Sequence, residues 1–186
     1  MGTSGGSDAR ARQDPLRERY KVAPQEAWIV DRARAIRGVE TDPFHGTVTP
    51  GSKDYGIAWP FAIHAAVGGD HDGPNPGDLL CTALAACLDS TIRIIADRLR
   101  VPLASLEVDV TAEVDVRGTL AVDRKVPVGF QKMHCRVAVQ AGPGADAAMV
   151  DRLLAAAEHS CVNLQTLRSG VPVETTFHRG APGEPG

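Results

Sequence analysis

Four cysteines are the residues through which this sequence could do chemistry: Cys81, Cys87, Cys135 and Cys161. A cysteine thiolate can attack an electrophile, bind a metal or form a disulfide with a second cysteine. The chain has no C-x-x-C, H-x-x-x-H or H-E-x-x-H segment and its histidines are scattered, so a zinc site is disfavoured. Three interpretations remain open: redox chemistry, a Cys–His hydrolase with a histidine distant in sequence, and inert cysteines that fill the core.

Two of these cysteines, Cys87 and Cys161, lie where a pair of helices could bring them together. Cys87 is in the middle of a long apolar segment, and Cys161 is on the apolar stripe of a second helical segment. Cys81 would point about 240° away from Cys87 around a helix. Cys135 shares its strand face with apolar residues, so we interpret Cys81 and Cys135 as core residues. His159 would point about 200° away from Cys161, which makes it a poor base for that thiol.

The elements that must position Cys87 are a β-meander and the helix that follows it. Alternating and β-branched residues predict three strands, and a cluster of glycine, proline and aspartate residues predicts the loop after them. A long helix is then expected from about Gly77 to Leu99, with Asn75 as its N-cap and Pro76 near its first turn. Its first half is apolar almost all round, which predicts burial on every side. The strands and the loop are expected at residues 28–36, 45–49, 55–67 and 68–76.

The elements around Cys161 are a strand pair, a second helix and a last strand. Leu106–Arg117 alternates strictly between apolar and polar residues and predicts a half-buried strand, with Phe130–Gln140 as its partner. A helix is expected over Asp146–Leu167, followed by Gly170 as its C-terminal cap and a strand over Val171–Phe177. The order β-β-β-α-β-β-α-β predicts the α+β class, with a mixed, mainly antiparallel sheet, a long buried central helix and a second packed helix.

Length, composition and charge set the limits of this prediction. The 186 residues, of which 43% are hydrophobic and 23% charged, predict one globular domain over residues 26–178, with flexible segments at 1–25 and 179–186. A net charge of −3 gives no basic surplus for nucleic acid. The polar N-terminus has no apolar signal segment, and we expect no segment to reach the roughly 18 apolar residues of a membrane span. We therefore expect a cytoplasmic protein with free cysteines.

One segment carries a resemblance to a known family. GPNPGDLL at residues 73–80, followed by ALAAC at residues 83–87, resembles the OsmC/Ohr family, in which a G-x-N-P-x-x-L segment opens the central helix that carries the reactive cysteine. The order of strands and helices over residues 28–177 is similar as well. The resemblance implies an OsmC-like fold and an interlocked homodimer with active sites at the interface.

The resemblance also implies a reaction, the thiol-dependent reduction of small hydrophobic organic hydroperoxides without a metal or organic cofactor. Cys87 would attack the peroxide and Cys161 would resolve the product as a disulfide, which an external dithiol then reduces. Burial raises the pKa of a thiol, so a cation is expected beside Cys87. In similar proteins an arginine held by a glutamate has this role; Arg37 is the candidate here, and Arg32 and Arg34 compete with it.

The sequence departs from the family pattern at two positions. Gly77 occupies the position of the glutamate that holds the arginine, with Asp78 beside it as a possible substitute. Val162 follows Cys161 where the family usually has proline. These departures keep two further hypotheses open: an OsmC-like dimer that binds an apolar ligand with inert thiols, and a redox sensor that oxidises the same pair without appreciable turnover.

Overall fold

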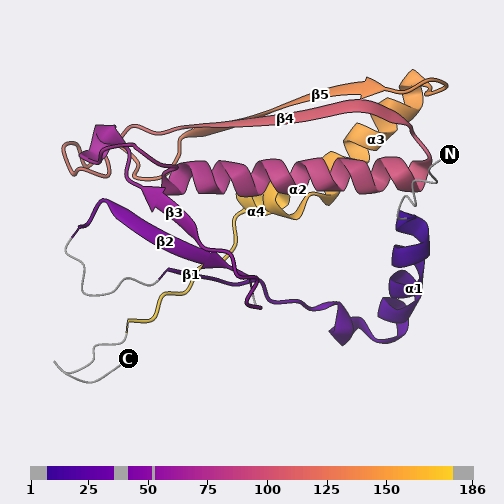
Figure 1. Cartoon of the computed structure of the whole chain (residues 1–186), viewed down its shortest axis with the longest axis horizontal. Coiled ribbons are helices and arrows are strands. Elements are labelled where there is room, and N and C mark those ends of the chain that lie inside the picture. Colours follow the sequence, from indigo (N-terminus) through magenta and orange to yellow (C-terminus); the bar gives the residue numbers. More distant parts are fainter. Residues whose placement is uncertain (1–7, 36–41, 52, 178–186) are drawn as a thin grey trace.

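The computed structural model describes residues 8–35, 42–51 and 53–177. Figure 1 shows a long central helix between a two-stranded ribbon on one side and a small three-stranded sheet on the other. Two further helices pack along the central helix, and an N-terminal helix lies at its C-terminal end. The elements are α1 (Ala9–Val22), the 3₁₀ turn η1 (Pro24–Ala27), β1 (Ala33–Ala35), β2 (His45–Pro50), β3 (Trp59–Ala62), the 3₁₀ turn η2 (Ala65–Val67), α2 (Pro76–Leu99), β4 (Leu103–Glu113), β5 (Lys132–Ala141), α3 (Ala147–Ser160) and α4 (Val162–Ser169).

The central helix α2 begins and ends close to the predicted positions. The Asn75 side chain accepts hydrogen bonds from the backbone N–H groups of Gly77 and Asp78, and the Asp78 carboxylate accepts one from the Asn75 N–H. This reciprocal arrangement is a capping box, which satisfies N–H groups that have no partner within the helix. Arg100, in the left-handed conformation with φ 57°, ends the helix. Four residues spaced by one turn form its buried face: Leu84, Leu88, Ile92 and Ala96.

The ribbon of β4 and β5 covers this buried face. The two strands are antiparallel, with a register that runs from Leu103 opposite Ala141 to Glu113 opposite Lys132. Alternation along β4 and β5 turns their apolar side chains towards the core, where they pack on α2, α3 and α4. The predicted α+β class and the predicted pairing of these strands are therefore confirmed.

The strands form two separate sheets among the described residues. β1, β2 and β3 make a three-stranded antiparallel sheet, and β4 and β5 make the second sheet. The mixed sheet predicted from the sequence is therefore wrong for this chain. The connection from β3 to β4 runs through α2, and Figure 1 shows that helix between the two sheets, so their edges do not meet.

The prediction of a flexible arm over residues 1–25 misses helix α1. Asp8 caps this helix through the N–H groups of Arg10 and Ala11. Polar contacts attach it to the end of α2: among them, the Ala9 N–H donates to Asp97 at 2.7 Å, and ion pairs join Arg98 to Asp14 at 2.8 Å and Arg100 to Asp8 at 2.9 Å. The helix was missed because polar contacts, rather than an apolar stripe, hold most of it in place.

Two other predictions fail in the last third of the chain. The single helix predicted over Asp146–Leu167 is two helices, α3 and α4, which break at Cys161. The strand predicted over Val171–Phe177 is not formed; the segment is exposed and has no strand partner among the described residues. Its alternating pattern alone cannot make a strand, because a strand needs a neighbour to satisfy its backbone groups.

The surface of α2 also differs from the expectation of burial on every side. Leu80 and Ile94 are 38% and 39% exposed, so the helix is buried along one face of this chain. The expectation that no segment could span a membrane was also too strict, because Pro76–Leu99 is long and apolar enough to do so by length and composition. The core helix of a soluble protein meets the same criteria, and α2 packs on β4, α3 and α4.

Candidate functional site

The structure brings Cys87 and Cys161 together. Cys87 lies in the middle of α2 and is partly buried, whereas Cys161 lies between α3 and α4 and is 0% exposed. The Cys87 thiol is near enough to Cys161 to raise the pKa of that thiol, and both thiols are free. Neighbouring thiols on packed helices are candidates for a disulfide, which forms where the two Cα atoms lie within about 7 Å of each other.

A break between two helices positions Cys161. Its backbone is extended, with φ −74° and ψ 109°; its N–H still bonds to the Ala157 oxygen of α3, at 3.0 Å. Its own carbonyl accepts the Gln165 N–H of α4, also at 3.0 Å. Cys161 therefore ends one helix and begins the next, and its side chain occupies the N-cap position of α4.

The surroundings of Cys161 act on its pKa in opposite directions. Burial raises the pKa of this thiol most, and the hydrogen bond and charge of Cys87 raise it further. The backbone N–H groups of Leu164 and Asn163, at the start of α4, lower it, although neither makes a regular capping hydrogen bond to the sulfur. The net effect is a raised pKa, so Cys161 holds its proton at neutral pH.

Three polar side chains hold α4 in place. Asn163 Nδ2 donates to the Ala83 oxygen of α2 at 2.9 Å. Gln165 Nε2 donates to the Glu158 oxygen of α3 at 2.8 Å, and Arg168 pairs with the Glu158 carboxylate at 2.6 Å. Sequence reasoning missed Asn163 because a lone polar residue on an otherwise helical stripe gives no signal of a contact with a distant helix.

The cation expected beside Cys87 stays a prediction. Arg37, the first candidate, lies outside the described residues. Arg32 and Arg34, the competing candidates, are exposed, and neither is among the groups that shift the pKa of Cys161. The structure therefore assigns no arginine to the thiol pair.

The position of the missing glutamate has a steric explanation. A Cβ atom on Gly77 would lie 2.9 Å from the Phe130 ring and 2.9 Å from the Asn75 side-chain oxygen. Asp78 is engaged at the helix end, where its carboxylate accepts two hydrogen bonds from Asn75, at 2.9 and 2.7 Å. Asp78 is therefore occupied as a cap, and the space that a longer side chain at position 77 would need is filled by Phe130.

The other two cysteines are partly buried, and of these Cys135 packs against the core cluster, as its interpretation as a core residue requires. Burial is the main cause that raises the pKa of Cys81, and the charge of Asp78 adds to it. Burial also raises the pKa of Cys135, against a lowering effect of the Arg168 charge. Both thiols are thus protonated and weakly nucleophilic at neutral pH.

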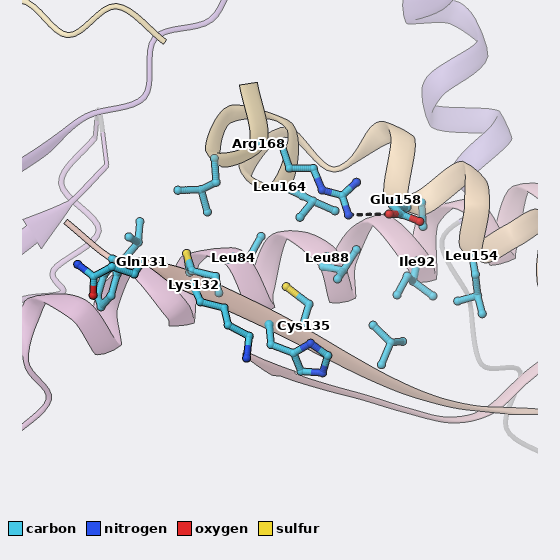
Figure 2. A pocket seen from close by; sticks show the side chains of 17 residues that line it. Leu84, Leu88, Ile92, Gln131, Lys132, Cys135, Leu154, Glu158, Leu164 and Arg168 are labelled. Atoms are coloured by element: carbon cyan, nitrogen blue, oxygen red, sulfur yellow. Dashed lines mark hydrogen bonds and ion pairs between the residues drawn. The ribbon is translucent and has the colours of Figure 1, made fainter. Parts of the chain in front are cut away.

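A cavity of about 720 Å³ lies beside the thiol pair, between α2, β5 and the α3–α4 segment. Figure 2 shows Leu84 and Leu88 of α2 on one side, Cys135 of β5 on another and the Arg168–Glu158 ion pair on the third. Neither Cys87 nor Cys161 lines this cavity. Within the part of the chain that the structure describes, no group of three His, Cys, Asp or Glu side chains is placed to hold a metal ion.

Solved structures with the same fold come from several bacteria. An OsmC-like protein of Vibrio cholerae matches with a TM-score of 0.61 and 12% identity, over 75% of this chain and 94% of that one. An OsmC-like protein of Mycoplasma pneumoniae matches with a TM-score of 0.59 and 12% identity, over 76% and 89%. An organic hydroperoxide resistance protein of Legionella pneumophila matches with a TM-score of 0.51 and 21% identity, over 75% and 90%.

At these identities the likeness concerns the fold. A search among curated protein sequences finds no match. The model of the family described as OsmC-like protein matches residues 69–176, a segment that contains both Cys87 and Cys161 and more than half of the chain. The chain therefore belongs to the OsmC-like protein family.

Proposed function

We propose that this protein reduces organic hydroperoxides with Cys87 as the attacking thiol and Cys161 as the resolving thiol. The observation that carries the proposal is that these two side chains are neighbours in the core, one partly exposed and the other buried. Family membership supports a peroxide-related role, as does the fold shared with an organic hydroperoxide resistance protein of Legionella pneumophila.

The difference in burial assigns the order of the two thiols. A peroxide can approach Cys87, which is partly exposed, but not Cys161, which is 0% exposed. The raised pKa of Cys161 keeps that thiol protonated. The thiol that a peroxide can reach is therefore assigned as the attacking one, and the buried, protonated thiol as the resolving one.

The proposed cycle has three steps. The Cys87 thiolate attacks the terminal oxygen of the hydroperoxide, the O–O bond breaks, and the alkoxide leaves and takes up a proton as an alcohol. Cys87 is then a sulfenic acid. The Cys161 sulfur attacks the Cys87 sulfur, an S–S bond forms, and the hydroxyl group leaves with the Cys161 proton as water. An external dithiol returns two electrons and two protons, which restores both thiols.

The direct test is consumption of cumene hydroperoxide in the presence of dithiothreitol. Cys87→Ser is expected to lower the rate by at least about a hundredfold, because it removes the nucleophile. Cys161→Ser is expected to stop the cycle at a sulfenic acid on Cys87, which dimedone traps and mass spectrometry locates. Cys135→Ser is the matched control and is expected to keep most of the activity. A Cys87→Ser protein as fast as the wild type would eliminate the proposal.

The cavity supports a second candidate function, the binding of an apolar ligand by a protein whose thiols are inert. Its volume of about 720 Å³ and its leucine-lined walls suit a small hydrophobic molecule. This candidate predicts no Cys87–Cys161 disulfide after peroxide treatment. A redox sensor predicts the disulfide without steady-state turnover. Mass spectrometry and steady-state kinetics on the wild type therefore separate the three functions.

We also infer a homodimer and a cytoplasmic location. Exposed leucine and isoleucine side chains on α2, among them Leu80 and Ile94, would be covered by a second copy of the chain. A cycle that depends on an external dithiol belongs in a reducing compartment such as the cytoplasm. Light scattering coupled to size-exclusion chromatography tests the dimer, and a mass near 19.6 kDa, that of one chain, would contradict it.

A further inference from the structure

Asn163 contacts both of the helical turns that carry the thiol pair. Its side-chain amide donates to the Ala83 oxygen at 2.9 Å, across 80 positions of the chain. Ala83 lies one helical turn before Cys87 on the same helix. Asn163 is also the second residue after Cys161, in the first turn of α4, and its backbone N–H lowers the pKa of the Cys161 thiol. One residue thus connects the immediate surroundings of both sulfurs.

The contact with Ala83 fixes α4 against a rigid support. A carbonyl oxygen has two lone pairs, so Ala83 can accept the Asn163 amide and still belong to the hydrogen-bond ladder of α2. Helix α4 has eight residues, Val162–Ser169, and a helix of that length is not stable alone in water. Its position therefore depends on the contacts that join it to its neighbours.

The other two polar side chains of α4 join this helix to α3 instead of α2. Gln165 and Arg168 both bind Glu158, so they hold the angle between α3 and α4. Within the described residues, the bond from Asn163 is the side-chain hydrogen bond that links α4 to α2. Its loss would leave the α3–α4 contacts intact, and apolar packing through Leu164 alone would then hold the start of α4, with Cys161, against α2.

We propose that Asn163 is a positioning residue that holds the Cys161 sulfur within bonding reach of the Cys87 sulfur. It sets how readily the two thiols close to a disulfide, and it takes no part in the attack on a peroxide. The inference deepens the proposed function, because closure is the second step of that cycle. It also stands apart from it, because any oxidised dithiol can drive the same closure with two electrons and two protons passing to that dithiol.

The first experiment measures closure without peroxide. Wild type, Asn163→Leu and Asn163→Asp are equilibrated with mixtures of reduced and oxidised dithiothreitol, and the Cys87–Cys161 disulfide is quantified by mass spectrometry. Leucine keeps the volume without a donor, and aspartate keeps the shape but places an oxygen against the carbonyl. The equilibrium constant for the disulfide is expected to fall at least about tenfold in both variants, because the effective concentration of the paired thiols falls.

The controls separate positioning from general damage to the fold. Gln165→Ala removes a hydrogen bond of the same helix that does not reach α2, and its disulfide constant is expected to stay within about threefold of the wild type. Asn163→Gln keeps an amide donor and is expected to recover part of the loss. Circular dichroism establishes that each variant is folded. Equal constants in the wild type and in folded Asn163→Leu or Asn163→Asp would overturn the inference.

The second experiment uses cumene hydroperoxide with dimedone present. In the Asn163 variants, sulfenic acid is expected to form on Cys87 at close to the wild-type rate and then to accumulate as the dimedone adduct, because its resolution is slow. A variant that closes the disulfide as fast as the wild type would contradict the inference. If wild-type Cys87 forms no sulfenic acid, the peroxidase proposal fails, and the dithiothreitol equilibrium still decides the role of Asn163.

Discussion

Cys87 and Cys161 are neighbours in space, but the chain holds them in two different ways. Cys87 lies within an unbroken helix of 24 residues, where its position follows from the helix itself. Cys161 lies at the junction of two helices, where the Asn163 side chain joins α4 to α2 and the Gln165 side chain joins α4 to α3. In the proposed cycle this difference would separate two roles, with the thiol on the unbroken helix attacking the substrate and the thiol at the junction closing the disulfide.

The largest expected effect comes from a substitution in the core, in the helix that carries Cys87. Leu84 is 1% exposed and belongs to the core between α2, α3 and the β4–β5 ribbon. Leu84→Ala is expected to lower the free energy of unfolding by about 2–5 kcal/mol, because it leaves a cavity among packed side chains. Val162→Ala, at a position 69% exposed, is the control and is expected to stay within about 0.5 kcal/mol. Urea denaturation measures both, and equal losses would show that the core is elsewhere.

The stability of the protein is expected to depend on pH through the ionisation of Cys161. The folded protein raises the pKa of Cys161, mainly through burial, so it holds that proton more tightly than the unfolded chain does. The resulting stability is fully present below the ordinary thiol pKa and is lost as pH rises through the raised value. Thermal unfolding midpoints are therefore expected to fall at alkaline pH, and to fall less in Cys161→Ala.

Some of this alkaline loss remains in the Cys161→Ala variant. Burial raises the pKa of Cys81 and Cys135 in the same direction, so these thiols also destabilise the fold when they ionise. Cys87→Ala adds a separate check, because it removes a neighbour that raises the pKa of Cys161. The alkaline fall of the unfolding midpoint is therefore expected to be smaller in that variant, and a larger fall would contradict the effect of Cys87 on the pKa of Cys161.

The smallest expected change in stability comes from a substitution of Val162, the residue after Cys161. Val162 is the first residue of α4, a position that suits proline, and Cys161 before it already has the extended backbone that precedes proline. Val162→Pro is therefore expected to stabilise the protein by about 0.4–1 kcal/mol, because it restricts the unfolded chain. Chemical denaturation measures the change. A clear destabilisation would mean that the Val162 N–H has a role that the fold does not reveal.

The sequence predicts the parts of this fold that have a long, regular pattern. Helix α2 was predicted within one residue of its observed ends because Asn75 and Pro76 mark its start and its apolar residues repeat each turn. The ladder of β4 and β5 was predicted from strict alternation. The candidate pair Cys87 and Cys161 follows from the apolar positions of both residues and from the family resemblance.

The features of the fold that the sequence did not predict depend on contacts between residues that are distant in the chain. The break at Cys161 has no glycine or proline to mark it, and the residues that hold it contact Ala83 and Glu158. Helix α1 was missed because its ion pairs reach residues more than 80 positions away. Local patterns describe a segment and its faces, whereas these features arise from which segments meet in the folded chain.

The Phe130 ring lies so close to Gly77 that the side chains allowed at these two positions depend on each other. A side chain at position 77 needs the volume that the Phe130 ring fills, so neither position can be redesigned alone. An engineer who wishes to give this chain the glutamate found at that place in similar proteins must shrink Phe130 in the same step. The paired substitution would reopen a wall of the cavity, which Phe130 lines, and so would exchange part of its apolar lining for a new carboxylate at the start of the central helix.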